Sequence, residues 1–261
     1  MPRPIWNAIA STYRKSLYSR YRKEMLRHPE DMSLYCPCCG LKYSEFVEGD
    51  YQEYPKFYDL KTFVGIPQDV CCPVCESLPR HRIEILWCEE HMDLLQGKDI
   101  LYFAIERSVK LWMKLKGVKC TTADLFAEAD LKLDIQDTGL PDNSYDVIFC
   151  NHVLEHVDDY MKALRELRRI LRPGGSLICS FPMSRDIEYV DEDPSVTSEE
   201  DRLIRFGQSD HVRLFGMNAD RFMKDAGFDV SIIDGDNCPP DILPVTAPCK
   251  YDMNRLFWCR K

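Results

Sequence analysis

The 261-residue sequence lacks any continuous apolar run of about 18 residues, so we expect no transmembrane helix. Its first residues lack the apolar core of a signal peptide, and we therefore expect a cytoplasmic protein. The sequence also lacks an excess of positive charge. Its formal net charge is −9, which excludes a global basic field and disfavours a nucleic-acid partner. No pattern in the sequence indicates an oligomeric state.

Cysteine, by contrast, is abundant, with 13 residues. The odd number and the missing secretion signal argue against a disulfide framework and favour metal binding by a subset. Two C-x-x-C pairs, Cys36/Cys39 and Cys72/Cys75, can bring four thiolates to one tetrahedral ion. Zinc is the usual ion for four thiolates, and a site without an open position is structural. The sequence therefore predicts a structural zinc module.

The spacing between the two pairs leaves alternatives open. It is longer than the usual ~15 to 20 residues, which predicts an inserted loop over about 45–67. Cys38 and Cys71 lie beside the predicted ligands, and either could replace a neighbour or face the core. The alternative to a zinc site is a group of buried free cysteines.

We expect three parts along the chain: an N-terminal amphipathic helix within 1–31, the four-cysteine zinc module over 32–81, and a larger domain over 82–261. Residues 5–28 alternate aromatic and basic side chains. We expect this helix to dock with its aromatic residues on the main domain; the alternative is contact with an anionic membrane surface or polymer. Apolar positions at helical spacing predict another helix over 82–95.

From Asp99 onward, strand and helix patterns alternate, which predicts an α/β fold with a parallel, helix-covered sheet and ligands at the carboxyl ends of its strands. The last two strands have no helical pattern between them, so we expect them to pair antiparallel. The acidic segment 191–201 lacks core residues and is expected to be a surface loop or lid. The predicted strands are 99–104, 118–123, 131–135, 145–150, 176–182, 229–234 and 255–260, and the predicted helices are 107–116, 159–171 and 219–228.

The run LKLDIQDTGLPDNSYDVIFCNHVLEHVDDYMKALRELRRILRPGGSLICSFP resembles the motif region of class I S-adenosylmethionine (SAM) dependent methyltransferases. The segments CPVCESLPRHR, ILYFAIERS and RLIRFGQSDHVRLFG further resemble a bacterial subgroup with an N-terminal four-cysteine zinc module. The resemblance implies a Rossmann-like, seven-stranded class I methyltransferase sheet, preceded by an N-terminal helix and a small zinc-ribbon-like module. It implies SAM as cofactor and methyl transfer as the reaction, but it does not identify the acceptor.

The resemblance implies two acidic contacts to SAM. Asp124 ends the second strand, where a carboxylate can bind both ribose hydroxyls, and Leu125 follows it. Asp134 and Ile135 follow the third strand, where an acidic and an apolar residue can contact the adenine.

The methionine end of SAM would meet the first and fourth strands. Asn151 and His152 follow the fourth strand and would line the methionine and methyl end. The first strand lacks the glycine-rich turn that usually follows it in this family. In the resembling subgroup a small residue and a glutamate replace that turn, which here implies Ala104 and Glu106, with Glu106 receiving the methionine ammonium.

Histidine suits proton removal near neutral pH, so two histidines are candidates for the catalytic base. His211 lies in a polar loop after the fifth strand, where Asp210 or another carboxylate could orient it. His152 is the rival because it is nearer the expected methyl position. His156 is expected to make a structural hydrogen bond at a helix start.

Four arginines could bind an anionic acceptor such as a phosphate or carboxylate: Arg80, Arg82, Arg205 and Arg213. The alternative for Arg80 and Arg82 is a structural link between the zinc module and the main domain, and Arg205 and Arg213 are similarly open to a structural role. The Pro-rich stretch 238–248 could form one pocket wall.

The sequence thus predicts a SAM-dependent methyltransferase whose acceptor is left open among small metabolites, sugars, peptides and lipid-linked glycans. The main alternative is a non-catalytic zinc-containing adaptor with a degenerate SAM-binding fold. A nucleic-acid-binding zinc protein is disfavoured by the net acidity. A nicotinamide-dependent oxidoreductase is disfavoured because the glycines that cradle a diphosphate are absent.

Overall fold

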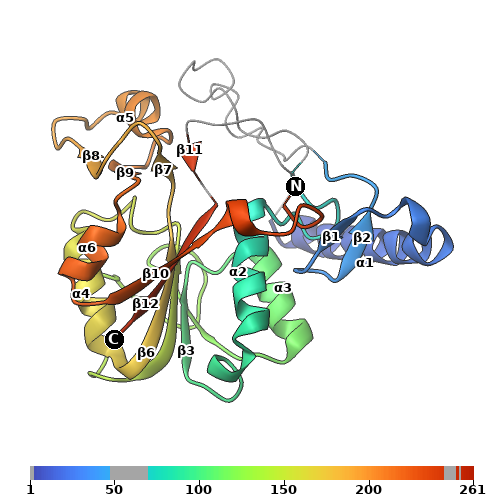
Figure 1. Cartoon of the computed structure of the whole chain (residues 1–261), viewed down its shortest axis with the longest axis horizontal. Coiled ribbons are helices and arrows are strands. Elements are labelled where there is room, and N and C mark those ends of the chain that lie inside the picture. Colours follow the sequence, from blue (N-terminus) through green and yellow to red (C-terminus); the bar gives the residue numbers. More distant parts are fainter. Residues whose placement is uncertain (1–2, 48–69, 244–250, 253) are drawn as a thin grey trace.

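A six-stranded sheet organises the computed structural model, which describes residues 3–47, 70–243, 251–252 and 254–261. The strand order is β10-β12-β6-β5-β3-β4 (Figure 1). The four strands β4, β3, β5 and β6 run parallel, and β12 pairs antiparallel with both β6 and β10, as expected for the last two strands. The strand bounds are β3 Ile100–Phe103, β4 Thr121–Ala123, β5 Tyr145–Asn151, β6 Leu171–Ser180, β10 Asp229–Asp234 and β12 Arg255–Arg260.

The predicted strand over 131–135 takes a shorter form. Leu131 makes a single parallel bridge to Ala123 at the edge of the sheet, in the place of a seventh strand. The chain then turns, because the Asp134 carboxylate accepts a hydrogen bond from the Gln136 backbone N–H at 2.8 Å. The local turn chemistry of an aspartate thus ends the strand after one pair.

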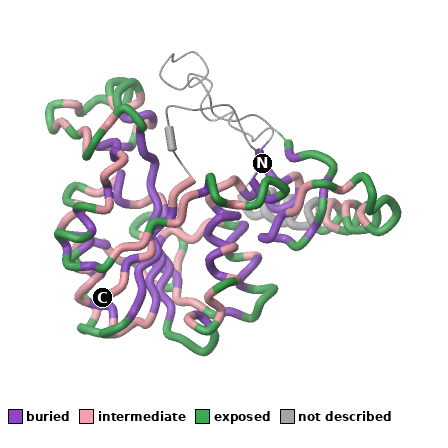
Figure 2. Tube along the Cα trace, in the orientation of Figure 1, coloured by how far each residue is buried: buried purple, intermediate pink, exposed green. Residues whose placement is uncertain are grey.

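Helices cover both faces of this sheet (Figure 1), and its central strands β3, β5 and β6 are largely buried (Figure 2). Alternate residues of β3 belong to two hydrophobic clusters: Tyr102 packs with α2 and α3, and Phe103 packs with α4 and α6. Strands buried on both faces have continuous apolar sequences, and ILYF and VIFC have this pattern. The helix bounds are α2 Pro79–Glu90, followed by a 3-10 turn over Met92–Leu94, α3 Arg107–Lys116, α4 Tyr160–Ile170 and α6 Asp220–Asp225.

The N-terminal helix α1 (Arg3–Arg27) packs on the cysteine module. The module contains a short 3-10 turn at Pro29–Asp31 and the antiparallel strands β1 (Leu34–Cys36) and β2 (Leu41–Tyr43). The Tyr21 ring meets the Tyr43 ring edge to face at 5.4 Å. In the part of the helix whose side chains are described, the aromatic contact is therefore made to the module. The insertion expected over 45–67 lies mostly outside the described residues.

The module and the sheet share one hydrophobic cluster, and Arg82 links them. The Arg82 side chain is fully buried, and its guanidinium donates to the carbonyl oxygens of Ile242, Val70 and Ser77 at 2.8–2.9 Å. It also lies 4.2 Å over the Phe46 ring. These contacts engage Arg82 as a link between the module and the larger domain, while its Nη2 has no hydrogen-bond partner among the described residues.

A second, four-stranded sheet of order β11-β7-β9-β8 follows β6. Its strands are β7 Met183–Ser184, β8 Val190–Glu192, β9 Arg213–Gly216 and β11 Tyr251–Asp252, and α5 spans Glu199–Phe206. The prediction of a loop over 191–201 is wrong at both ends, because β8 covers its start and α5 begins at Glu199. The Ser198 side chain caps α5 by accepting from the Asp201 N–H, and Gly207 ends the helix at φ +90°. Of the proposed pocket wall over 238–248, only residues 238–243 are described.

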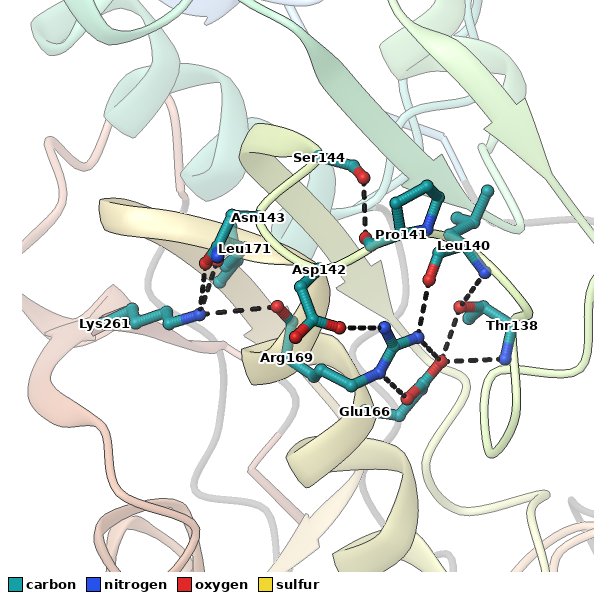
Figure 3. Close-up of polar contacts among 10 residues, drawn as sticks. All are labelled: Thr138, Leu140, Pro141, Asp142, Asn143, Ser144, Glu166, Arg169, Leu171 and Lys261. Atoms are coloured by element: carbon teal, nitrogen blue, oxygen red, sulfur yellow. Dashed lines mark hydrogen bonds and ion pairs between the residues drawn. The ribbon is translucent and has the colours of Figure 1, made fainter.

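An arginine clamp holds the loop before β5 against α4 (Figure 3). Arg169 donates to Glu166, Asp142 and the Leu140 carbonyl oxygen at 2.5–2.8 Å. Glu166 in turn accepts from the Thr138 N–H and hydroxyl. The bonds from Arg169, with those from Thr138, lower the pKa of Glu166 to about 2. The clamp fixes the long loop between Leu131 and β5.

Candidate functional site

The topological switch point of the sheet lies between β3 and β5. The chain leaves β3 toward β4 on one side, and the next strand, β5, pairs on the other side. In open α/β sheets, ligands bind outside the carboxyl ends of the strands at such a point. The residues that directly follow β3 and β5 are Ala104 and His152. This edge of the sheet is therefore the candidate ligand-binding site.

Both residues have left-handed backbone conformations that favour glycine. Ala104 has φ +50° and His152 has φ +54°. For a residue with a Cβ this conformation costs about 1–2 kcal/mol, and such strain concentrates at functional sites. The Ala104 N–H donates to the Ala123 carbonyl oxygen at 2.9 Å, and the His152 N–H donates to Ser180 at 2.8 Å. The turn after β3 contains no glycine, and Ala104 adopts the left-handed conformation there.

Glu106 lies two residues further on and is ion-paired with the start of α2. The Arg80 Nη2 donates to Glu106 at 2.7 Å, and His81 Nε2 contacts the other carboxylate oxygen. Burial opposes ionisation, but these two groups hold the pKa of Glu106 well below its usual range. Arg80 therefore links the module to the sheet, as in the structural alternative, and the residue expected to meet a methionine ammonium already has protein partners.

The expected ribose and adenine residues lie along the edge beyond β4. Asp124 Oδ1 accepts from the Phe126 and Ala127 N–H groups at 2.7 Å, while Oδ2 accepts no hydrogen bond from the described residues. Leu125 is exposed, whereas Ile135 is only 4% exposed. Asp134 is half-buried. Asp124 thus has one carboxylate oxygen available to a ligand, and Ile135 belongs mainly to the core.

Asn151 belongs to a buried polar chain. Its Nδ2 donates to the Tyr102 hydroxyl at 3.2 Å, and its Oδ1 accepts from the Ser180 hydroxyl at 2.8 Å. The Tyr102 hydroxyl donates to Glu84 at 2.7 Å. Burial raises the pKa of Glu84 to about 8, so its carboxyl is mostly protonated at neutral pH.

Glu84 and Tyr102 were not predicted as site residues from the sequence. The signal was present: Glu84 is a carboxyl between two isoleucines of a helix, and such residues are rarely buried without a partner. Asn151, expected beside the cofactor, is 6% exposed and held by this chain of hydrogen bonds.

A histidine cluster follows β5. His152 Nδ1 lies 3.3 Å from the Glu155 carboxylate, and His156 Nδ1 lies 3.3 Å from Asp210. The His211 Nδ1 lies 3.1 Å from the Phe206 carbonyl oxygen, and its ring meets the His156 ring edge to face at 4.7 Å. Asp210 therefore lies against His156, which stands in the turn before α4, and a backbone carbonyl orients His211.

Electrostatics differ among these groups. Burial lowers the pKa of His211. Burial acts in the same direction on His156, but the Asp210 carboxylate outweighs it and raises the pKa of His156. The pKa of Glu155 is lowered although burial opposes this, because His152 lies beside it. The cluster therefore combines a buried carboxylate with imidazoles of contrasting basicity.

The remaining two arginines are also engaged by protein groups. Arg213 is 3% exposed and donates to the carbonyl oxygens of Leu154, Val157 and Asp158. The Arg213 guanidinium therefore braces the loop after β5. Arg205 is more exposed, but Asp191 and Asp193 pair with it at 2.7 and 2.6 Å.

The four predicted zinc ligands converge. Cys36, Cys39, Cys72 and Cys75 are all buried, with their sulfurs within 4.8 Å of one another. The Cys36–Cys75 and Cys39–Cys72 sulfur distances are 3.6 and 3.8 Å. Four sulfurs at 2.3 Å from one ion in a tetrahedron lie about 3.8 Å apart. The residues present therefore fit a tetrahedral zinc ion.

The surroundings of the sulfurs suit thiolates. The Ser77 hydroxyl lies 3.1 Å from the Cys36 sulfur, and the Tyr43 hydroxyl lies 3.1 and 3.4 Å from the sulfurs of Cys39 and Cys72. Each C-x-x-C turn is closed by a left-handed residue, Gly40 at φ +72° and Glu76 at φ +59°.

The two neighbouring cysteines do not join this group. Cys38 and Cys71 are buried but stand outside the converging set of four. Every cysteine in the described part of the chain is a free thiol. None of the described helices is both long and apolar enough to span a membrane.

Comparison with known proteins gives a match within the sheet domain. Residues 108–179 match the family described as a methyltransferase domain. A demethylmenaquinone methyltransferase of Listeria monocytogenes is 39% identical over 67 residues, which are 26% of this chain and 28% of that protein. An uncharacterised transposon protein of Streptomyces fradiae is 34% identical over 119 residues, which are 44% of this chain and 30% of that protein. The alignments thus span less than one third of each relative.

Solved structures described as methyltransferases are similar to part of this chain. A SAM-dependent methyltransferase from Mesorhizobium loti has 15% identity and a TM-score of 0.45, covering 69% of this chain and 98% of that one. A SAM-dependent methyltransferase from Archaeoglobus fulgidus has 13% identity and a TM-score of 0.44, covering 69% and 94%. The match over 108–179 lies within the segment from α3 to β6, and the described strand order is that of a Rossmann-like α/β sheet.

Proposed function

We propose that this protein binds SAM at the carboxyl ends of β4, β3 and β5 and transfers its methyl group to an acceptor. The observation that carries the proposal is the pair of left-handed residues, Ala104 and His152, at the switch point of a methyltransferase sheet. Strained backbone conformations cluster at ligand-binding sites. In sheets of this type the cofactor packs closely against the backbone that follows the first strand, which can require such a conformation.

Asp124 is our choice for the ribose hydroxyls. Its Oδ1 stabilises the following turn, and its Oδ2 is open among the described residues. A carboxylate that accepts from a hydroxyl makes a hydrogen bond worth about 1.5–3 kcal/mol. Asp134, half-buried on the same edge, is our choice for the adenine amino group. In this proposal Ala104 and Glu106 flank the methionine end, with the ammonium joining the Arg80–Glu106 pair or displacing Arg80 from it.

We favour His152 over His211 as the acceptor's base. His152 directly follows β5, and its Nε2 is buried and has no hydrogen-bond partner among the described residues. Its Nδ1 faces Glu155 at 3.3 Å, which would stabilise the imidazolium formed when Nε2 takes a proton. In-line displacement then needs only alignment of the acceptor with the methyl carbon.

We also propose that the four cysteines hold one structural zinc ion. The sulfur distances and the hydroxyls of Ser77 and Tyr43 support it. Zinc would cross-link two short loops of the module. Arg82 of α2 donates to the carbonyl oxygens of Val70 and Ser77 beside the second loop, and so connects the module to α2. Metal analysis of purified protein tests this proposal, which requires zinc that is lost from a Cys39→Ser, Cys72→Ser variant.

Calorimetry with S-adenosylhomocysteine tests the cofactor proposal. The wild-type chain should bind one equivalent, and Asp124→Asn should bind about 10- to 100-fold more weakly, because 1.4 kcal/mol corresponds to a factor of ten. The matched control is Glu128→Gln, an exposed carboxyl in the same loop, which should leave affinity unchanged. Equal affinities for wild type and Asp124→Asn would reject the assigned ribose contact.

A further inference from the structure

We propose a divalent-cation site formed by Glu155, His156 and His211, separate from the cysteine module. The three residues each offer one ligand atom, and these atoms lie within 4.8 Å of one another. Two of the residues follow β5, and the third lies in the turn between α5 and β9. Two imidazoles and one carboxylate form a ligand set that suits zinc and other first-row transition metals.

The Glu155 carboxylate points to a missing positive partner. Its side chain is 1% exposed, and neither carboxylate oxygen accepts a hydrogen bond from the described residues. The nearest nitrogens are His152 Nδ1 at 3.3 Å and His156 Nε2 at 4.0 Å. A buried carboxylate whose nearest nitrogens are two imidazoles at 3.3 and 4.0 Å is costly unless a further charge compensates it. A bound cation would satisfy both oxygens at once.

The two imidazoles are oriented as metal ligands usually are. His156 Nδ1 faces the Asp210 carboxylate at 3.3 Å, and His211 Nδ1 faces the Phe206 carbonyl oxygen at 3.1 Å. An acceptor at Nδ1 fixes the proton there and leaves the lone pair on Nε2. This second layer of acceptors is the arrangement that orients and strengthens histidine ligands.

The two loops that carry the ligands are braced against each other. The Val212 N–H donates to the Glu155 carbonyl oxygen at 2.9 Å. Arg213 donates to the carbonyl oxygens of Leu154 and Asp158, on both sides of Glu155 and His156. These backbone contacts hold the two loops together, so that the three ligand atoms lie within 4.8 Å of one another.

The site would serve the acceptor. All four arginines expected to hold an anionic acceptor are engaged by protein groups. Three protein ligands leave positions open on the ion, and these would bind an anionic oxygen of the acceptor beside His152. This role rests on the proposed methyltransferase function, whereas the existence of the site does not.

Metal content after dialysis against zinc and removal of loosely bound ion is the primary test. We expect two zinc ions per chain in the wild type and one in Glu155→Gln and in His211→Asn. The matched control is His28→Asn, which disrupts the exposed group His28, Glu30 and Asp31 and should retain two. One ion per wild-type chain, or loss of the second ion in His28→Asn alone, would overturn the proposal.

Cobalt spectroscopy of the wild-type chain makes the test independent of folding in the variants. Co²⁺ added to protein that already holds one zinc should give ligand-field bands without sulfur-to-cobalt charge transfer, because the site contains only nitrogen and oxygen ligands. Absence of these bands, or bands with charge transfer alone, would contradict it. S-adenosylhomocysteine binding measured on the same samples separates the two proposals: retained binding with no second ion rejects only the cation site, and a second ion without binding rejects only the cofactor proposal.

Discussion

Replacing the buried Glu84 with glutamine should remove a large pH dependence of stability. Burial raises the pKa of this carboxyl from its usual 4.5 to about 8, and Glu106 adds to the effect while Arg80 opposes it. Between pH 4.5 and about pH 8, Glu84 is therefore protonated in the folded state but ionised in the unfolded state. The stabilising contribution is therefore complete below pH 4.5 and is lost as the pH rises through 8.

Because one proton is bound only in the folded state, the free energy of unfolding falls by about 1.4 kcal/mol for each unit by which the pH rises in this range. Glutamine matches the neutral carboxyl in shape and still accepts from the Tyr102 hydroxyl, which lies 2.7 Å from Glu84. Urea unfolding of wild type and Glu84→Gln at pH 5, 6, 7 and 8 should give similar stabilities at the lowest pH and a variant that is more stable by several kcal/mol at the highest. A difference that does not change with pH would refute the reasoning. Glu90→Gln, at the exposed end of α2, is the control and should show no such trend.

Three further predictions follow from single contacts. Arg169→Ala should lower the free energy of unfolding by about 1–3 kcal/mol in urea titrations, because it leaves Glu166 without its cation, whereas the exposed Arg165→Ala should change it by less than about 0.5 kcal/mol. Ala104→Gly should raise it by up to about 1 kcal/mol by relieving the left-handed backbone, while Ala163→Gly in α4 should lower it; a loss in both would contradict the strain. Chelation of zinc should lower the melting temperature, and added zinc should restore it; an unchanged melting temperature would count against a structural ion.

Much of the fold could be predicted from local patterns. The runs ILYF and VIFC are continuous and apolar because their strands are buried on both faces, and α4 begins where the Asp159 side chain accepts from the Lys162 N–H. The strand expected at 131–135 was longer than the single Leu131 bridge, because an Asp134 turn competes with pairing. Periodicity does not reveal such side-chain to backbone bonds.

The site was harder to predict because charge partners come from distant parts of the chain. The C-x-x-C spacing alone places the two sulfurs of each pair in one tight turn, and the four cysteines converge as expected. Nothing in the local sequence tells that Arg82 donates to Ile242, 160 positions away, or that Arg213 braces the carbonyl groups after β5. An arginine in a polar segment can bind a ligand only when backbone carbonyl groups do not already accept the hydrogen bonds of its guanidinium.

Equilibrium dialysis with isotopically labelled SAM tests the central claim most directly. The wild-type chain should retain one SAM per folded molecule, S-adenosylhomocysteine should displace it, and a nicotinamide dinucleotide should not. The signal should fall strongly in Asp124→Asn and persist in Glu128→Gln. Folded protein that retains no SAM, or that releases it to the nicotinamide dinucleotide, would contradict the assignment of the edge around Ala104, Asp124 and His152 as a SAM site.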